Sequence, residues 1–179
     1  MTDDGDDPGS ETPASSAAFE EVYRTHREAV YRYCLTRLRN PELAEDVCED
    51  VFVSAIRSYR RAPIVDAEVK LWLMRIAHNA VIDHWRRRSR WSRVTTVLHG
   101  GEMSAVNVEQ SVIDRSALRA VFEAMTGLRS KERELVSLRI GAGLTYAEIA
   151  KVVAMSEEGV RTATRRAIAK LQAAADGAE

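Results

Sequence analysis

The chain has 179 residues, of which 45% are hydrophobic and 30% are charged, and its formal net charge is -1 at pH 7. This balance excludes a fibrous or largely disordered chain and leaves room for one ordinary domain or two small ones. The net charge alone does not indicate a nucleic-acid partner, so such a partner has to be inferred from how the charges are distributed.

The first 16 residues are acidic and contain almost no apolar side chains. Such a segment cannot bury enough surface to offset its ordering entropy, so residues 1–16 are predicted to form a disordered acidic tail. A signal peptide would be basic at this end, and no apolar run approaches the length of a membrane span. We therefore expect a cytoplasmic protein that does not insert into membranes.

Apolar residues recur at helical spacing through the rest of the N-terminal half. The spacing predicts helices over residues 16–39, from Pro41 to about Tyr59, and over residues 67–90, with Asn40 as the N-cap of the second. Three amphipathic helices with short connections form a small bundle.

Cys34 and Cys48 both lie on the apolar stripes of these helices. Their spacing matches neither a zinc site nor a redox pair, so both are predicted to pack in the core. His78 and His84 are too far apart on one helix for a metal pair, and no carboxylate cluster completes a site. We therefore expect no metal, no cofactor and no enzymatic activity. A nuclease is the more distant alternative.

The end of the third predicted helix is rich in arginine and tryptophan: Trp85 directly precedes the basic stretch from Arg86 to Arg93, and Trp91 lies within it. Cations at a helix C-terminus interact favourably with the helix dipole, which is the simpler explanation. That effect is under about 1 kcal/mol per exposed charge and does not require several adjacent arginines. Binding to nucleic acid explains them better, because arginines neutralise phosphates and tryptophans stack on unpaired bases.

The stretch from Lys70 to Arg87 resembles region 2 of the extracytoplasmic-function sigma factors. In that family a Trp-Leu pair opens the helix, Ile-Ala-x-Asn follows, and then come an aspartate and a run of arginines. The preceding stretch from Ala44 to Ala55 resembles the polymerase-binding helix of the family. Glu49 stands where glutamine is commoner and Asp50 where a hydroxyl residue is commoner, which makes this surface more acidic.

The resemblance implies roles for named residues. A base flipped out of the DNA stack costs a few kcal/mol, and Asn79 has the donor and acceptor needed to bind it. Asp83 is expected to pair with an arginine one turn away. The implied polymerase-binding residues are Asp46, Glu49, Asp50, Phe52 and Arg57. The implied minus-10 contacts are Arg60, Arg61, Asn79, Trp85, Arg86, Arg87, Arg88 and Arg90.

A second set of helices is predicted after residues 92–113, which contain Gly100 and Gly101 and show neither helical nor strand periodicity. Residues 92–113 are therefore predicted to be a flexible linker. Helices are expected over residues 113–125 and 130–140, the latter with Leu135, Leu138 and Ile140 available to the core.

A helix-turn-helix is predicted from residue 145 onward. Thr145 and Glu148 form a capping box that starts one helix, and Ser156 is a suitable N-cap for the next. The last helix presents arginines on its outer face, the geometry of a recognition helix in the DNA major groove. Glu157 and Glu158 at the start of this helix are expected to interact favourably with the positive end of the helix dipole. Alternatively, either glutamate could accept a hydrogen bond from a cytosine.

This stretch resembles region 4 of the same family, which reads the minus-35 promoter element. Leu144 to Ala150 matches the family's Leu-Ser-Tyr-x-Glu-Ile-Ala, whereas Val160 to Ala163 lacks one customary arginine. The implied minus-35 contacts are Thr145, Ser156, Arg161, Thr162, Arg165 and Arg166.

The order of these motifs predicts an all-α protein with two small helical domains joined by a flexible linker, the second containing a helix-turn-helix. The boundaries are 17–91 for region 2, 92–113 for the linker, 114–173 for region 4 and 174–179 for a tail. The predicted function is that of an alternative sigma factor, with core RNA polymerase, promoter DNA and an anti-sigma factor as partners. The alternative is a conventional helix-turn-helix regulator that acts without being a polymerase subunit.

Overall fold

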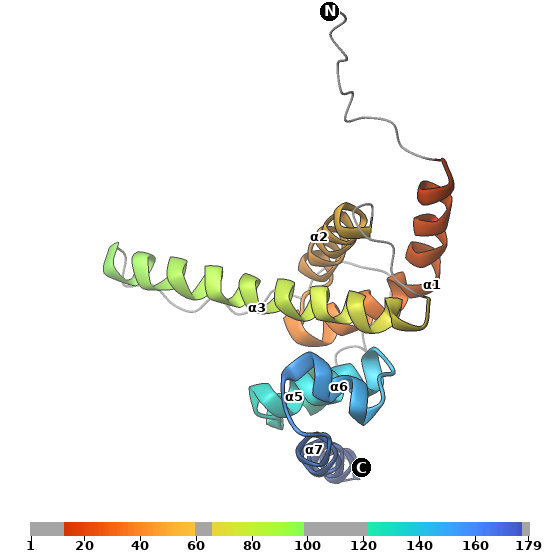
Figure 1. Ribbon diagram of the computed structural model, residues 1–179. Helices are drawn as coiled ribbons and strands as arrows, with labels where there is room; N and C mark the ends of the chain where they lie inside the picture. The colour runs from red at the N-terminus through yellow and green to blue at the C-terminus, as the bar shows by residue number, and fades with distance from the viewer. Residues whose placement is uncertain (1–12, 60–65, 99–121, 177–179) are drawn as a thin grey trace, which may run out of the picture.

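The computed structural model describes residues 13–59, 66–98 and 122–176, and every regular element in these ranges is a helix (Figure 1). The prediction of an all-α protein is therefore confirmed. The N-terminal half contains α1 (Pro13–Leu38), α2 (Pro41–Tyr59) and α3 (Asp66–Leu98). The C-terminal half contains η1 (Met125–Gly127), α5 (Ser130–Val136), η2 (Ser137–Gly141), α6 (Tyr146–Val153) and α7 (Glu157–Asp176).

Helices α1, α2 and α3 pack against one another around an apolar core. Val30, Cys34, Val51 and Leu73 are fully or almost fully buried there, and burial of one such side chain contributes roughly 1.5–3 kcal/mol for the larger aliphatic ones. The predicted N-cap is confirmed, because the backbone amide of Leu43 donates to Oδ1 of Asn40 at 3.0 Å. Cys34 and Cys48 are both buried free thiols, as predicted.

Helix α3 continues to Leu98 instead of ending at Arg90, so the first part of the predicted linker is helical. Its last turns extend beyond the bundle formed with α1 and α2 (Figure 1). The sequence holds no proline or glycine between Arg90 and Leu98, and Gly100 is the first helix-breaking residue. The remainder of the predicted linker lies outside the described residues.

The helix-turn-helix is formed by α6 and α7. The capping box is confirmed, since the Glu148 amide donates to Oγ1 of Thr145 at 3.2 Å and the Thr145 amide donates to Oε2 of Glu148 at 2.7 Å. Ala154 in the turn has a left-handed backbone with φ 53°. Ser156 caps α7, because its Oγ accepts from the Gly159 amide at 3.2 Å.

The helix predicted over residues 130–140 is α-helical only to Val136, and η2 then continues it as a π-helical turn. The Ala142 amide accordingly donates to the Ser137 carbonyl, five residues back, at 3.0 Å. In this wider turn the side chain of Ile140 points outward and is 62% exposed. The prediction that Ile140 lies in the core is therefore wrong. Leu138 remains fully buried.

The two halves of the chain pack against each other, a contact that the sequence did not predict. Helices α1 and α3 contact α5, η2 and α6, and one hydrophobic cluster includes side chains from both halves. Lys70 on α3 donates to the Gly143 carbonyl at 3.1 Å. Helix α7 lies on the far side of α5 and α6 from α3 (Figure 1).

Within the described residues, no helix combines the length and the apolar character that crossing a membrane requires. The same residues contain no group of three or more histidine, cysteine or acidic side chains placed to hold a metal ion.

Candidate nucleic-acid interface

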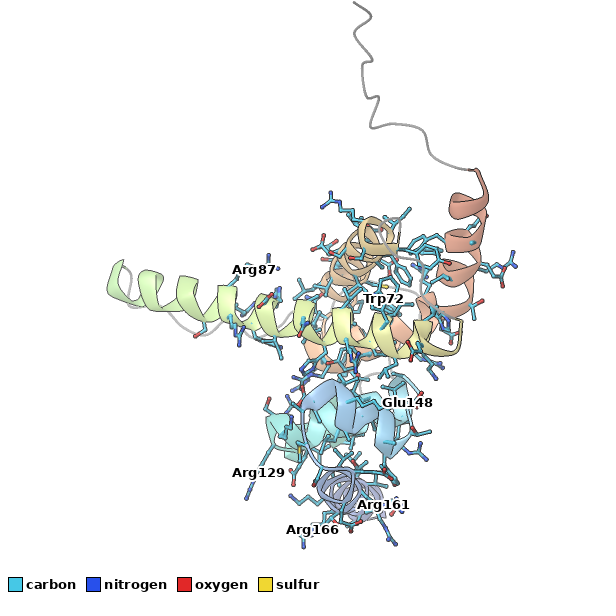
Figure 2. All side chains as sticks on the ribbon, viewed as in Figure 1. Trp72, Arg87, Arg129, Glu148, Arg161 and Arg166 are labelled. Atoms are coloured by element: carbon cyan, nitrogen blue, oxygen red, sulfur yellow. The ribbon has the colours of Figure 1, made fainter. Side chains whose placement is uncertain are left out.

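The exposed part of α3 carries the arginines that the sequence assigned to DNA. Arg86, Arg87 and Arg88 are all exposed, and Trp85 is 41% exposed beside them. Consecutive residues on a helix point about 100° apart, so these three guanidinium groups surround the helix instead of sharing one face. Figure 2 places Arg87 on the part of α3 that extends past the bundle. The arrangement presents positive charge to a ligand approaching from several directions.

Few acidic groups neutralise this end of α3. Nη1 of Arg86 lies 3.4 Å from Oδ1 of Asp83, the expected pair one turn apart, and both groups are exposed, where such pairs are weak. Arg87 and Arg88 form no ion pair with any residue that the structure describes. Burial lowers the pKa of His84, and the charges of Arg87 and Arg88 lower it further. His84 is therefore neutral near pH 7 and the arginines supply the charge.

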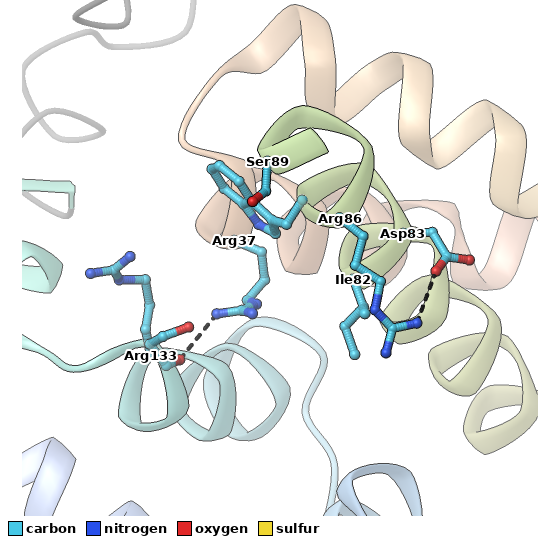
Figure 3. Close-up of a pocket in the computed structure, with 8 residues that line it drawn as sticks. Arg37, Ile82, Asp83, Arg86, Ser89 and Arg133 are labelled. Carbon is cyan, nitrogen blue, oxygen red and sulfur yellow. Dashed lines mark hydrogen bonds and ion pairs between the residues drawn. The ribbon is translucent and has the colours of Figure 1, made fainter. Parts of the chain in front are cut away.

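An open cavity of about 840 Å³ lies at the base of this segment (Figure 3). Both halves of the chain line it: Trp85 and Arg86 come from α3, Arg37 from α1, and Arg133 from α5. Figure 3 shows Arg37 donating to the Ser130 carbonyl, a bond of 3.2 Å. The cavity is positively charged because three arginines and one carboxylate, Asp83, line it.

Asn79 is exposed on α3, where its amide is accessible to a base. The side chain of Arg90, and the whole of Arg60 and Arg61, lie outside the described residues. The structure therefore groups Asn79, Trp85 and the adjacent arginines on one helix and leaves the predicted loop contacts untested.

The outer face of α7 has a different charge balance. Nη2 of Arg161 lies 2.7 Å from Oε1 of Glu157, and Oγ1 of Thr162 donates to Oε1 of Glu158 at 3.3 Å. Arg165 and Arg166 are exposed and form no ion pair within the described residues. Figure 2 shows Arg166 on α7. Of the predicted contacts on this helix, two are thus engaged with glutamates and two are free.

Two further predicted minus-35 residues serve as caps in the structure. Thr145 and Ser156 are exposed, but the oxygen of each accepts a hydrogen bond from the backbone of its own helix. Tyr146 next to Thr145 is stacked by two arginines, with the guanidinium carbon of Arg139 at 4.9 Å and that of Arg161 at 5.4 Å from the ring centroid. These contacts fix α6 against the start of α7.

The predicted polymerase-binding residues occupy α2. Asp46, Glu49, Asp50 and Arg57 are exposed there. Phe52 is 5% exposed and packs edge-on against Tyr23 and Phe19, so it belongs to the core, and its contact with polymerase stays a prediction. Its position in the i, i+4 stripe of α2 was the available signal that it belongs to the core.

Residues 22–90 match the family model for sigma-70 region 2, and residues 124–173 match the model for sigma-70 region 4. The chain is 31% identical over 159 residues to the ECF RNA polymerase sigma factor BldN of Streptomyces coelicolor, an alignment covering 86% of this chain and 59% of BldN. The chain belongs to the extracytoplasmic-function sigma factors. This assignment confirms the predicted alternative sigma factor and does not favour a conventional regulator.

Other similar proteins match this sigma factor over more of their own length than BldN does. It is 28% identical to the ECF RNA polymerase sigma factor SigM of Bacillus subtilis over 158 residues, covering 86% of this chain and 93% of SigM. Its fold is similar to that of RpoE of Bartonella quintana, solved in complex with the anti-sigma factor NepR, with a TM-score of 0.73, 19% identity, and coverage of 87% and 94%. It is also similar to CnrH bound to the cytosolic domain of CnrY, with a TM-score of 0.66, 24% identity, and coverage of 93% and 94%.

One group of polar residues, which lies where regions 2 and 4 meet, was not predicted from the sequence. Nδ1 of His78 lies 3.0 Å from Oε1 of Glu134 and 3.4 Å from the hydroxyl of Tyr33. Glu134 also pairs with Lys131 at 2.8 Å. No periodicity or motif connects residues so far apart in the chain, so the sequence held no signal for this cluster.

Proposed function

We propose that this chain acts as an alternative sigma factor that binds core RNA polymerase and directs it to promoter DNA. The observation that carries the proposal is the pairing of two separate basic surfaces, one on α3 within region 2 and one on α7 within region 4. A protein that reads one site needs one such surface, whereas promoter recognition at two elements needs two.

Region 2 contacts the minus-10 element through the exposed part of α3. Asn79 binds a base that has left the stack, Trp85 supplies a flat surface beside it, and Arg86, Arg87 and Arg88 hold the neighbouring phosphates. Their exposure, and the absence of ion pairs at Arg87 and Arg88 with any described residue, support this assignment. Arg60, Arg61 and Arg90 belong to the same proposed surface.

Region 4 contacts the minus-35 element through α7. Arg165 and Arg166 are available for phosphates or for guanine edges, while Arg161 and Thr162 reach DNA by exchanging their glutamate partners for it. Thr145 and Ser156 hold the two helices at the correct angle and place their backbones near the phosphates.

Helix α2 supplies the contact to polymerase. Asp46, Glu49, Asp50 and Arg57 are exposed on it, and α2 packs against α1 and α3 on the side away from region 4 (Figure 1). Polymerase holds both regions near the promoter, so that two weak DNA contacts become one stable engagement. The protein acts in the cytoplasm, and an anti-sigma factor is a further proposed partner, since the similar RpoE and CnrH were solved with NepR and CnrY.

Run-off transcription with core polymerase and a pool of promoters tests the proposal. We expect new transcripts when the protein is added, and their loss with Asn79→Ala. The exposed Arg75 lies one turn before Asn79 on α3, so Arg75→Ala is a matched control that should retain activity. Tight operator binding without polymerase, together with no transcripts, would establish the conventional regulator instead.

A further inference from the structure

The cavity at the base of the exposed part of α3 is lined by more cations than the protein neutralises. Arg37, Arg86 and Arg133 come from three different helices. Among the described lining residues Asp83 is the one carboxylate, and its Oδ1 is already 3.4 Å from Nη1 of Arg86. In the view of Figure 3, Arg37 lies between Arg133 and Arg86. A cavity wall of this composition favours an anionic ligand.

Arg37 is a buried cation, 7% exposed, whose bonds within the protein leave part of its guanidinium group unmatched. Nη1 of Arg37 donates to the neutral carbonyl of Ser130 at 3.2 Å, and Nε has no hydrogen-bond partner among the described residues. The charge of Arg37 acts on Glu134, but His78 and Lys131 hold the two oxygens of that carboxylate. Because a buried charge without full pairing is costly, an anion at the cavity wall would stabilise Arg37.

Arg133 on α5 is bonded in a similar way. Its Nε donates to the Met125 carbonyl at 3.3 Å and its Nη2 to the Leu128 carbonyl at 3.0 Å, and both acceptors are neutral. Burial lowers the pKa of Arg133, and the positive charges of Arg39 and Arg37 lower it further. The fold therefore holds like charges together at this wall, where a bound anion would offset their repulsion.

The same cavity also has an aromatic wall. Trp85 lines it and is 41% exposed, and Ser89 and Ser130 add hydroxyl groups. An exposed indole stacks on a nucleobase, and guanidinium groups bind phosphate oxygens through paired hydrogen bonds. The volume of about 840 Å³ lies within the range of roughly 300–1,000 Å³ that is typical of small-molecule sites. Inorganic phosphate would leave the indole without a partner, and an uncharged aromatic ligand would leave the arginines without one.

We propose that this cavity binds a free nucleoside di- or triphosphate, with the phosphates against Arg37 and Arg133 and the base stacked on Trp85. Such a ligand carries both the negative charge and the flat ring that the two walls require. Because Trp85 and Arg86 also belong to the proposed minus-10 surface, a bound nucleotide competes with promoter DNA for this part of α3. That competition rests on the proposed function, whereas nucleotide binding by itself does not.

Titration of the full-length protein with ATP, GTP, ADP and GDP, without polymerase, tests the site. We expect saturable binding of at least one of these nucleotides by calorimetry, with a change in tryptophan fluorescence that Trp85→Ala removes. The matching nucleoside and inorganic phosphate should each bind at least about tenfold more weakly, since each engages only one of the two walls. No saturable binding of any of the four nucleotides would overturn the proposal.

Substitutions of two lining residues locate the bound nucleotide. Arg133→Ala and Trp85→Ala should each weaken nucleotide binding about tenfold, the first through loss of a charged contact and the second through loss of the stacking surface. The exposed Arg129 lies one turn before Arg133 and does not line the cavity, so Arg129→Ala is the matched control and should bind as the parent does. Circular dichroism verifies folding, and Trp85→Ala decides if Arg133→Ala fails to fold. Equal binding by the parent and by every folded variant would overturn the proposal.

A second measurement separates failure of the nucleotide site from failure of the proposed function. Promoter binding by the protein with core polymerase is followed with and without ADP or GDP, which polymerase does not incorporate. We expect the diphosphate to weaken the promoter complex of the parent protein a few-fold and to leave that of Arg133→Ala unchanged, since Arg133 lies outside the proposed DNA contacts. An equal effect on both proteins would overturn the competition. Nucleotide binding by a protein that directs no transcription would support the site and refute the proposed function.

A single-stranded oligonucleotide carries the same phosphates and bases as a free nucleotide, so it provides the last comparison. We expect Arg133→Ala to bind the oligonucleotide as the parent does, because the proposed strand contacts lie on α3. Loss of oligonucleotide binding in Arg133→Ala, together with no saturable binding of ATP, GTP, ADP or GDP to the parent, would overturn the proposal and assign the cavity to the promoter strand.

Discussion

The two basic surfaces of this sigma factor carry arginines in different electrostatic settings. Arg87 and Arg88 on α3 have no acidic partner among the described residues, whereas Arg161 on α7 is paired with Glu157 on the same helix. An unpaired arginine can bind any phosphate, whatever the DNA sequence. A paired arginine binds DNA only where its interaction with the DNA is stronger than its ion pair with the glutamate. From this difference we expect strong, salt-sensitive binding by region 2 and a more selective contact by region 4.

Replacing the α3 arginines should produce the largest effect. We expect Arg86→Ala/Arg87→Ala/Arg88→Ala to weaken the promoter complex about a hundredfold, at roughly 1 kcal/mol per lost charged contact. The slope of log affinity against log salt should fall by about 2 to 3, since each phosphate contact contributes about 0.7–0.9. Filter binding of the holoenzyme over a salt series measures both quantities.

The control for this variant replaces arginines that are already paired on α1. Arg24 and Arg32 are exposed and lie next to Glu21 and Glu28. Arg24→Ala/Arg32→Ala should leave the affinity and the salt slope unchanged. An equal loss in both variants would mean that net charge, and not the α3 surface, governs binding.

On α7, the free and the paired arginines should behave differently. Arg165→Ala/Arg166→Ala is expected to weaken binding to minus-35 duplex about tenfold and to lower the salt slope by about 2. Arg161→Ala should change the slope less, because freeing that side chain first breaks its pair with Glu157. Conversely, Glu157→Gln/Glu158→Gln should strengthen binding to non-specific DNA a few-fold. Unchanged or weaker binding of this variant to non-specific DNA would contradict the proposed selectivity.

Acid should weaken the contact between the two regions. The pKa of Glu134 is lowered from 4.5 to about 2, so its ionised form stabilises the native state above pH 4.5. That contribution is lost as the pH falls from about 4.5 towards about 2. Thermal unfolding of the parent and of Glu134→Gln should therefore converge over this range. A constant difference between the two at every pH would show that the charge of Glu134 has no part in it.

The caps of the two regions offer a smaller, matched comparison. Asn40 caps α2 in region 2 and Thr145 caps α6 in region 4. Asn40→Ala and Thr145→Ala should each lower the free energy of unfolding by about 1 kcal/mol. Chemical denaturation measures both, and a much larger cost at Thr145 would indicate that its bonds with Glu148 also support the contact with DNA-binding α7.

The smallest expected effect is a stabilisation in the helix-turn-helix. Ala154 adopts a left-handed backbone that glycine adopts without strain. Ala154→Gly should raise the free energy of unfolding by up to about 1 kcal/mol. The control Ala80→Gly, in the interior of α3, should lower the free energy of unfolding by a similar amount. A loss of stability with Ala154→Gly would mean that the turn relaxes in solution.

The sequence by itself determined the helices, their caps and the residues that each exposes. Local rules suffice there: period 3.6 identifies buried stripes, and Thr145 with Glu148 or Asn40 alone marks a helix start. The order of the motifs identified the family. The same rules erred where a helix changes its period, as at Ile140.

Only the tertiary structure decided that regions 2 and 4 share an interface and which charges it buries. His78 and Glu134 are separated by much of the chain, including the predicted linker, and neither lies in a pattern that names a partner. Periodicity shows that a helix has an apolar face but not which other helix covers it. Whether His78 and Glu134 pair depends on the free energy of burying the two groups together. That free energy is set by how α3 and α5 pack, which local sequence patterns do not contain.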